Sequence, residues 1–153
     1  MKPKEYTSSF RRTIETGDLY YTASHTLIGS LIRLFSRSKV SHVGIFLRLG
    51  NRVFVVEATP WGVIMELASI RLRGIKFYST KTDLKHPEKL ITPILNDVGR
   101  VGYNFIGLVL SLIVRTKTQE KFCSEWIADK LGLEFPALKR GIIPSDIFDH
   151  YSK

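Results

Sequence analysis

Cys123 is the only cysteine among the 153 residues of the chain, and it is the residue best suited to nucleophilic chemistry. A thiolate is the reactive form, and the free N–H groups and dipole of a helix N-terminus stabilise it. If the surrounding helix starts near residues 118–120, Cys123 lies in its first turn or two, and Lys121 adds positive charge. Lone cysteines are usually core residues, and Cys123 shares a helical face with Trp126, so a structural role is the competing interpretation.

A histidine and a glutamate that could assist this thiol occur upstream. Residues 42–48 and 53–58 are rich in β-branched and aromatic side chains, and a short segment containing Gly-Asn separates them, which predicts a β-hairpin. With a loop of two or of four residues, Gly44 lies opposite Glu57. His42 and Glu57 then share one face as diagonal neighbours, with Cα atoms about 7–8 Å apart. If Glu57 is buried it needs a partner, because an unpaired buried charge is costly.

Alternatives exist for both residues. Three other histidines compete for the role of base: His25, His86 and His150. None of them has a carboxylate placed beside it by strand pairing, as His42 has. Glu57 could instead be an exposed residue at a strand end, paired with Arg48 or Arg52.

Cys123, His42 and Glu57 together have the residue types of a nucleophile, a base and an orienting carboxylate. The base takes the thiol proton, the carboxylate holds the imidazole in one tautomer, and the thiolate attacks an acyl carbon. Backbone N–H groups around Cys123 would stabilise the resulting oxyanion. The set therefore predicts acyl-transfer chemistry.

The elements that must position these residues indicate an α+β fold. Strands are expected at residues 19–22, 42–48, 53–58, 62–67 and 76–80. Apolar periodicity predicts helices over 25–36, 87–100, about 104–114, a segment that carries Cys123 and ends near Gly132, and a last short segment from Pro144. This order is typical of helices packed against a small antiparallel sheet. We expect a single domain over 1–153, with a polar lead-in at 1–15 and a catalytic domain at 16–150.

Composition limits the class of protein. Hydrophobic content of 44% and charged content of 24% are ordinary globular values, and the net charge of +9 favours anionic partners or a simple basic surface. No specific nucleic-acid-binding motif occurs, and a single cysteine excludes a multi-cysteine metal site. The first 12 residues lack the apolar core of a signal peptide, and the longest apolar stretch, residues 105–114, is too short to span a bilayer. We therefore expect no transmembrane segment and a cytoplasmic location by default.

The order of five segments resembles the circularly permuted papain-like (NlpC-type) hydrolases of the YiiX/YebB-like group, which are related to lecithin:retinol acyltransferase. The segments are Gly17-Asp18-Leu19, Ser41-His42-Val43-Gly44-Ile45, Val56-Glu57-Ala58 followed by Gly62-Val63, Tyr103-Asn104-Phe105, and Phe122-Cys123-Ser124-Glu125. The similarity covers roughly residues 16–148. Singly these segments are weak signals, and as a set they are fairly specific.

The resemblance implies a permuted papain-like fold in which the histidine and acidic strands precede the nucleophile helix. It implies that Cys123 is the nucleophile, His42 the base and Glu57 the orienting residue, and that Tyr103 supports the active site or the oxyanion. The family more often has aspartate after that tyrosine, where this chain has Asn104.

The sequence therefore predicts a cysteine hydrolase or acyltransferase that cleaves an amide or ester bond without a metal or organic cofactor. Two substrate classes stay open, a cell-wall (murein) peptide and a lipid acyl group. The basic loop 115–121 and the apolar segment 105–114 would approach a membrane surface in the second case. A non-catalytic basic binding module on the same fold is the alternative.

Overall fold

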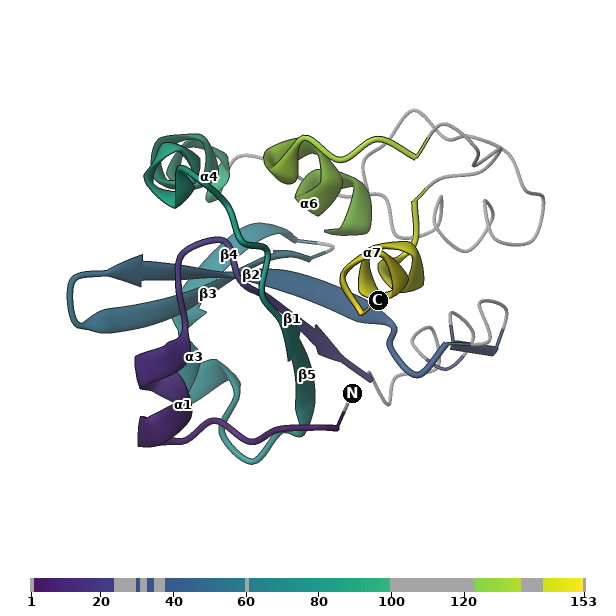
Figure 1. Cartoon of the computed structure of the whole chain (residues 1–153), viewed down its shortest axis with the longest axis horizontal. Helices are drawn as coiled ribbons and strands as arrows, with labels where there is room; N and C mark the ends of the chain where they lie inside the picture. The colour runs from purple at the N-terminus through teal and green to yellow at the C-terminus, as the bar shows by residue number, and fades with distance from the viewer. Residues whose placement is uncertain are drawn as a thin grey trace.

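A five-stranded antiparallel sheet in the order β4-β3-β2-β1-β5 forms the centre of the molecule (Figure 1). The structure is a computed structural model that describes residues 2–23, 30, 33–34, 38–59, 61–99, 123–135 and 142–152. The strands are β1 (Leu19–Thr22), β2 (His42–Leu49), β3 (Arg52–Thr59), β4 (Gly62–Leu67) and β5 (Phe77–Thr80). The helices are α1 (Ser8–Thr13), α3 (Ala68–Arg71), the 3-10 helix η1 (Pro87–Leu90), α4 (Ile91–Asp97), α6 (Cys123–Leu131) and α7 (Pro144–Tyr151). The α+β class is confirmed.

The β2–β3 hairpin has the predicted register, with Ile45 opposite Val56 and Leu47 opposite Phe54. The loop is the shorter of the two that the sequence allowed, because β2 ends at Leu49 and β3 begins at Arg52. Gly50 begins this turn with a φ of +57°, a conformation that glycine adopts without steric cost. The register fixes which side chains of the two strands share a face.

Helices cover both faces of the sheet. Figure 1 shows α4 and α6 on one side and α1 and α3 on the other. The first face packs Val43, Ile45, Leu47, Val56 and Ala58 against Ile94 of α4, Trp126 and Ile127 of α6 and Ile147 of α7. The second face buries Tyr20, Phe46, Val53, Val55, Ala68, Leu72 and Phe77. Alternation along β2 and β3 therefore sends His42 and Glu57 to the second face, as predicted.

Most element boundaries agree with the expected ones. Strands β1 and β4 and the start of α7 are confirmed, and β5 begins one residue later than expected. The helix expected over 87–100 is shorter: it divides into η1 and α4 and ends at Asp97. The predicted elements omitted α1 and α3, which have six and four residues. The helix expected over 25–36 lies largely outside the described residues, and that over 104–114 lies wholly outside them.

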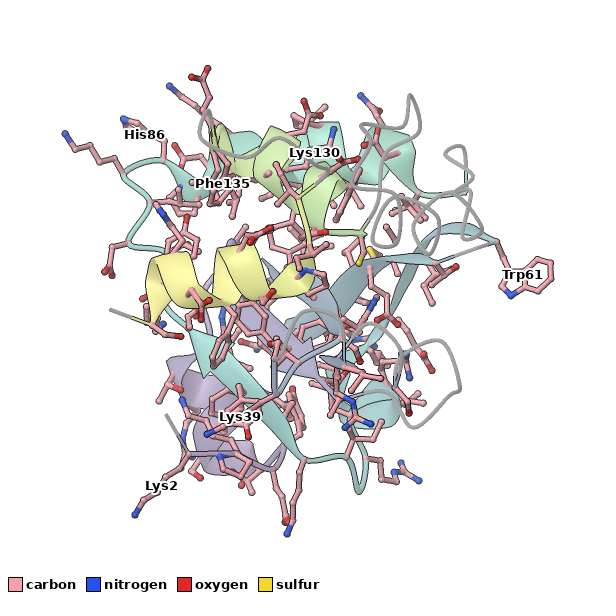
Figure 2. All side chains as sticks on the ribbon, turned by 90° about the vertical axis from the view of Figure 1, so that its right-hand side faces the viewer. Lys2, Lys39, Trp61, His86, Lys130 and Phe135 are labelled. Atoms are coloured by element: carbon pink, nitrogen blue, oxygen red, sulfur yellow. The ribbon has the colours of Figure 1, made fainter. Side chains whose placement is uncertain are left out.

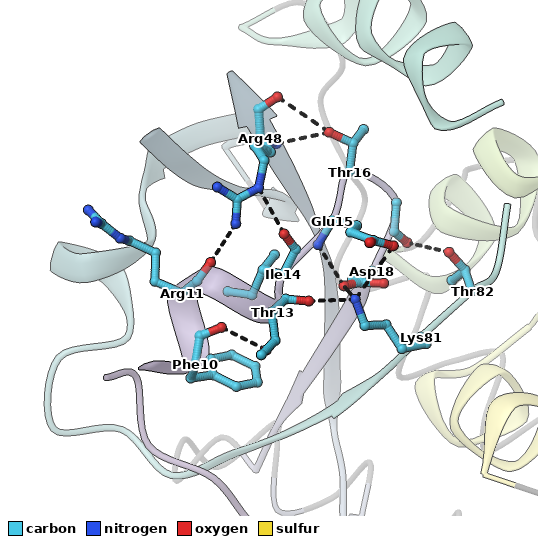
Figure 3. Close-up of polar contacts among 11 residues, drawn as sticks. Phe10, Arg11, Thr13, Ile14, Glu15, Thr16, Asp18, Arg48, Lys81 and Thr82 are labelled. Carbon is cyan, nitrogen blue, oxygen red and sulfur yellow. Dashed lines mark hydrogen bonds and ion pairs between the residues drawn. The ribbon is translucent and has the colours of Figure 1, made fainter. Parts of the chain in front are cut away.

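The turn before β1 is held by a lysine from the segment after β5 (Figure 3). Asp18 is 4% exposed and accepts hydrogen bonds from the Glu15 backbone N–H and from Lys81 Nζ, both at 2.8 Å. Burial raises the pKa of Asp18, and the bond from Lys81 opposes that rise. Gly17 has a φ of +97°, and a Cβ at this position would lie 2.6 Å from Leu84 Cδ1. The Gly17-Asp18 pair therefore serves to fix the start of β1.

None of the helices in the described ranges has the length and apolar character that a bilayer crossing requires.

Candidate active site

His42 and Glu57 lie in direct contact, with His42 Nε2 2.5 Å from Glu57 Oε2. Glu57 is fully buried, whereas the His42 side chain is 21% exposed. The alternative of an exposed Glu57 paired with Arg48 is therefore wrong. Arg48 instead donates to the backbone oxygens of Ile14 and Arg11 and ties α1 to β2. The carboxylate that the hairpin register places beside His42 is thus buried and paired.

Two further donors bind Glu57, and neither was predicted from the sequence. The Tyr20 hydroxyl donates to Oε2 at 2.7 Å, and Arg71 Nε donates to Oε1. Burial alone would raise the pKa of Glu57, but the bonds and positive charges of His42 and Arg71 lower it to about 2. Glu57 is consequently a carboxylate at neutral pH.

Tyr20 reaches Glu57 because a glycine lies beneath its ring. Tyr20 of β1 is opposite Gly44 of β2, and a Cβ on Gly44 would lie 2.4 Å from Tyr20 Cε1 and 2.6 Å from its hydroxyl. No other residue leaves room for the ring. Burial, and then the charge of Glu57, raise the pKa of Tyr20 well above its usual value, so the hydroxyl remains a donor. The signal for this contact in the sequence is a glycine inside a strand, which often marks a close approach.

Arg71 is brought to Glu57 by the short helix α3. Ala68 is buried in the second face of the sheet and fixes the start of this helix, and Arg71 ends it. The Arg71 side chain remains 37% exposed. A single helical turn has no hydrophobic periodicity, so no pattern in the sequence could have placed this arginine.

Cys123 is the first residue of α6 as described, and its side chain is half-buried. Its thiol lies close enough to His42 to influence the pKa of the imidazole. Burial on its own lowers the pKa of His42, but the bonds and negative charges of Cys123 and Glu57 raise it to about 10. Because Nε2 faces Glu57, Nδ1 is the ring nitrogen left for the thiol. The expected helix start at 118–120 lies outside the described residues.

Two hydrogen bonds hold the first turn of helix α6, which carries Cys123, in place. Trp126 is buried against the sheet and donates from Nε1 to Asp97 Oδ2 of α4 at 2.7 Å. Ser124 is also buried and donates from Oγ to the backbone oxygen of Ile142 at 2.5 Å, just before α7. These contacts fix the end of the helix that presents Cys123 to His42.

The other candidate residues lie elsewhere or are not described. His86 is exposed and contacts Glu88 at 3.2 Å, and His150 stacks on Phe135. The remaining candidates lie outside the described residues: His25, Tyr103, Asn104 and the segment 115–121. Within the described ranges, no group of three or more His, Cys, Asp or Glu side chains could hold a metal ion.

Large apolar side chains are exposed close to Glu57. Ile64 is directly opposite Glu57 in β4 and is 37% exposed. Ile70 precedes Arg71 and is 52% exposed. Trp61 lies in the β3–β4 turn, is 93% exposed and points away from the body of the protein (Figure 2). The chain thus offers apolar as well as charged groups at this end of the sheet.

Comparison with known proteins finds a similar sequence in a bacterial protein. Over 99 residues, which are 63% of this chain, the sequence is 35% identical to a protein of Escherichia coli (strain K12) named "Probable lipoprotein peptidase YaeF". The chain is thus similar to part of a protein that is named as a probable peptidase. The match covers 35% of that protein, so this chain spans about a third of its relative's length. No protein-family model matches the chain.

Proposed function

We propose that this protein is a cysteine hydrolase of the peptidase type that acts through Cys123, His42 and Glu57. The observation that carries the proposal is His42, held between a half-buried thiol and a fully buried carboxylate. The similarity to a protein named as a peptidase supports the same reaction class. A permuted papain-like fold is part of the proposal, since the histidine and acidic strands precede the cysteine helix here as the resemblance implies.

In the proposed reaction, His42 takes the proton of the Cys123 thiol, which gives a thiolate beside an imidazolium. The thiolate attacks the acyl carbon of an amide or ester, a C–S bond forms, and the carbonyl electron pair moves to oxygen. His42 gives its proton to the leaving amine or alcohol as that bond breaks. Neutral His42 then takes a proton from water, the resulting hydroxide attacks the thioester carbon, and the C–S bond breaks. The acid leaves, and Cys123 remains as a thiolate beside the His42 imidazolium. Another acyl acceptor in place of water gives transfer instead of hydrolysis.

Each supporting group has a defined part in this scheme. Glu57 stays ionised, because its pKa is about 2, and orients the imidazole through Nε2. Backbone N–H groups at the start of α6 are the proposed donors to the oxyanion. Tyr103 is proposed to support the site, as the resemblance implies. No metal or organic cofactor takes part.

The proposed substrates are a cell-wall peptide and a lipid acyl group. The net charge of +9 favours a substrate carried on an anionic polymer or surface. The exposed side chains of Trp61, Ile64 and Ile70 favour a substrate with an apolar portion. Incubation with purified murein and, separately, with phospholipid vesicles, followed by mass spectrometry of released fragments, distinguishes the two.

Thiol labelling tests the nucleophile directly. Iodoacetamide at pH 7 is expected to alkylate Cys123 at least about tenfold faster than glutathione, because the imidazolium stabilises the thiolate. His42→Ala should slow labelling to the rate of an ordinary thiol, whereas His86→Ala, a change to an exposed histidine, should leave it unchanged. Labelling no faster than glutathione, together with full activity of Cys123→Ala on every substrate that is cleaved, would show the proposal to be wrong.

The binding-module alternative predicts a different set of results. The basic charge of the chain is the observation that favours it. In that case neither murein nor phospholipid is cleaved, Cys123→Ala binds a polyanion as well as the wild type does, and binding falls steeply with salt.

A further inference from the structure

Four ionisable side chains follow one another through the site, each beside the next. The order is the Cys123 thiol, the His42 imidazole, the Glu57 carboxylate and the Arg71 guanidinium. His42 and Arg71 bind different oxygens of the same carboxylate, Oε2 and Oε1. The guanidinium therefore lies one carboxylate away from the imidazole.

We propose that Arg71 is a positioning residue that balances the charge of Glu57, so that the two residues orient His42 together as a neutral pair. This inference rests on the proposed function for the role of His42 in catalysis. Arg71 acts on the reaction through Glu57, the residue that its guanidinium binds.

The physical reason is the burial of Glu57. An isolated carboxylate in that position would attract the imidazolium with little screening by water, and His42 would give up its proton to a leaving group less readily. A guanidinium on the opposite oxygen cancels much of that attraction. The Tyr20 hydroxyl helps by sharing Oε2 with His42. Glu57 then supplies orientation through its hydrogen bond without binding the proton of His42 too tightly.

Within the part of the chain that the structure describes, the charged and titratable groups around His42 come from four elements. Cys123 of α6, Glu57 of β3 and Tyr20 of β1 lie closest, and Arg71 of α3 lies behind Glu57. Glu66 of β4 acts on Arg71 by charge. Because the Arg71 guanidinium binds Glu57 directly, removal of Glu57 alone leaves a positive charge facing the imidazolium.

This consequence gives a test that distinguishes an Arg71 that balances charge from an Arg71 with a structural role alone. The variants are Glu57→Gln, the double variant Glu57→Gln with Arg71→Met, and Glu57→Gln with Arg73→Met as a matched control from the exposed turn after α3. The pKa of His42 is measured in each by NMR titration of the imidazole ring. It should be higher in the Arg71 double variant than in Glu57→Gln by about one pH unit, because the unbalanced guanidinium is gone. The Arg73 control should match Glu57→Gln.

Thiol labelling gives a second readout. Iodoacetamide labelling at pH 7 should slow in Glu57→Gln and recover at least about threefold in the double variant with Arg71→Met. Arg71→Lys, which keeps the charge, should label Cys123 at close to the wild-type rate. The double variant removes both charges, so it remains a usable test even if Arg71→Met alone leaves Glu57 unpaired and does not fold.

Failure of this inference can be told apart from failure of the proposed function. The NMR titration needs no substrate and no reactive thiol. A pKa of His42 in the Arg71 double variant equal to or below that of Glu57→Gln would overturn the role of Arg71. If the pKa shifts as expected while wild-type Cys123 labels no faster than glutathione, the charge balance stands and the proposed nucleophile is wrong.

Discussion

Gly44→Ala is the substitution that most directly tests how Tyr20 supports Glu57. The added methyl group would lie 2.4 Å from Tyr20 Cε1 and 2.6 Å from both Cζ and the hydroxyl oxygen. The Tyr20 ring is 1% exposed and packs near Phe46 and Phe77, so it cannot simply swing into solvent. Gly44 does not have a positive φ, so the backbone itself accepts alanine. The whole effect must then come from displacement of the ring.

The size of the effect follows from three contributions. Overpacking of a buried site costs about 1–3 kcal/mol. Loss of the Tyr20 bond to the buried Glu57 carboxylate costs about 1.5–3 kcal/mol. Replacing a strand glycine returns about 0.5–1 kcal/mol of backbone entropy. The free energy of unfolding should fall by about 2–5 kcal/mol, which lowers Tm by about 6–15 °C for a domain of this size.

Urea unfolding followed by circular dichroism, in a double-mutant cycle, separates the steric part from the rest. Tyr20→Leu removes the ring atoms that clash, so Gly44→Ala should cost less than about 1 kcal/mol in that background. Tyr20→Phe keeps the clashing ring carbons but lacks the hydroxyl, so it should relieve only the part of the cost that comes from the lost bond to Glu57. Gly50→Ala is the control, because its cost of about 1 kcal/mol arises from a positive φ with no atom nearby and should be the same in both backgrounds. An equal cost of Gly44→Ala with Tyr20 or Leu at position 20 would refute the reasoning.

Three further predictions concern stability. Glu57→Gln should lower the free energy of unfolding by about 3 kcal/mol above about pH 5, because the pKa of Glu57 is lowered from 4.5 to about 2 in the folded protein. The difference between variant and wild type should vanish as pH falls toward 2, and urea unfolding between pH 2 and 7 measures this difference. Lys81→Met should destabilise by about 1–3 kcal/mol because it leaves the buried Asp18 carboxylate with one donor fewer, whereas Lys85→Met should change the unfolding midpoint little. Arg48→Met should release α1 from β2 and speed tryptic cleavage within that helix, seen by mass spectrometry of limited digests, and equal rates would contradict the anchoring role.

The hairpin shows what could be predicted from the sequence. Alternating side chains and a short turn define the register of neighbouring strands, and Ile45 lies opposite Val56 as expected. From that register His42 and Glu57 fall on one face, and the structure brings them into contact. Local pattern was sufficient because the two strands are joined by only two residues.

Tyr20 and Arg71 could not be placed in the same way. Tyr20 meets Glu57 only because β1 pairs with β2 across a separation of about 20 residues, and nothing local determines that pairing. The glycine at position 44 was the one available sign of a close approach, and it does not say which residue approaches. Arg71 lies in a helix of four residues, which is too short for periodicity to reveal. A single sequence gives no local signal for residues that act through contacts distant in sequence.

The charged residues on the second face of the sheet are explained better by a chemical role than by packing. Phe46, Val55 and Tyr20 form an apolar layer there, yet the layer also contains the charges of Glu57 and Arg71. Desolvating such an ion pair roughly cancels its attraction, and apolar residues of the same volume often stabilise a fold as well or better. Packing alone therefore gives no reason for a glutamate at position 57. A requirement to hold His42 in one orientation beside a thiol does give one, because a buried acceptor that stays ionised fixes the imidazole through Nε2.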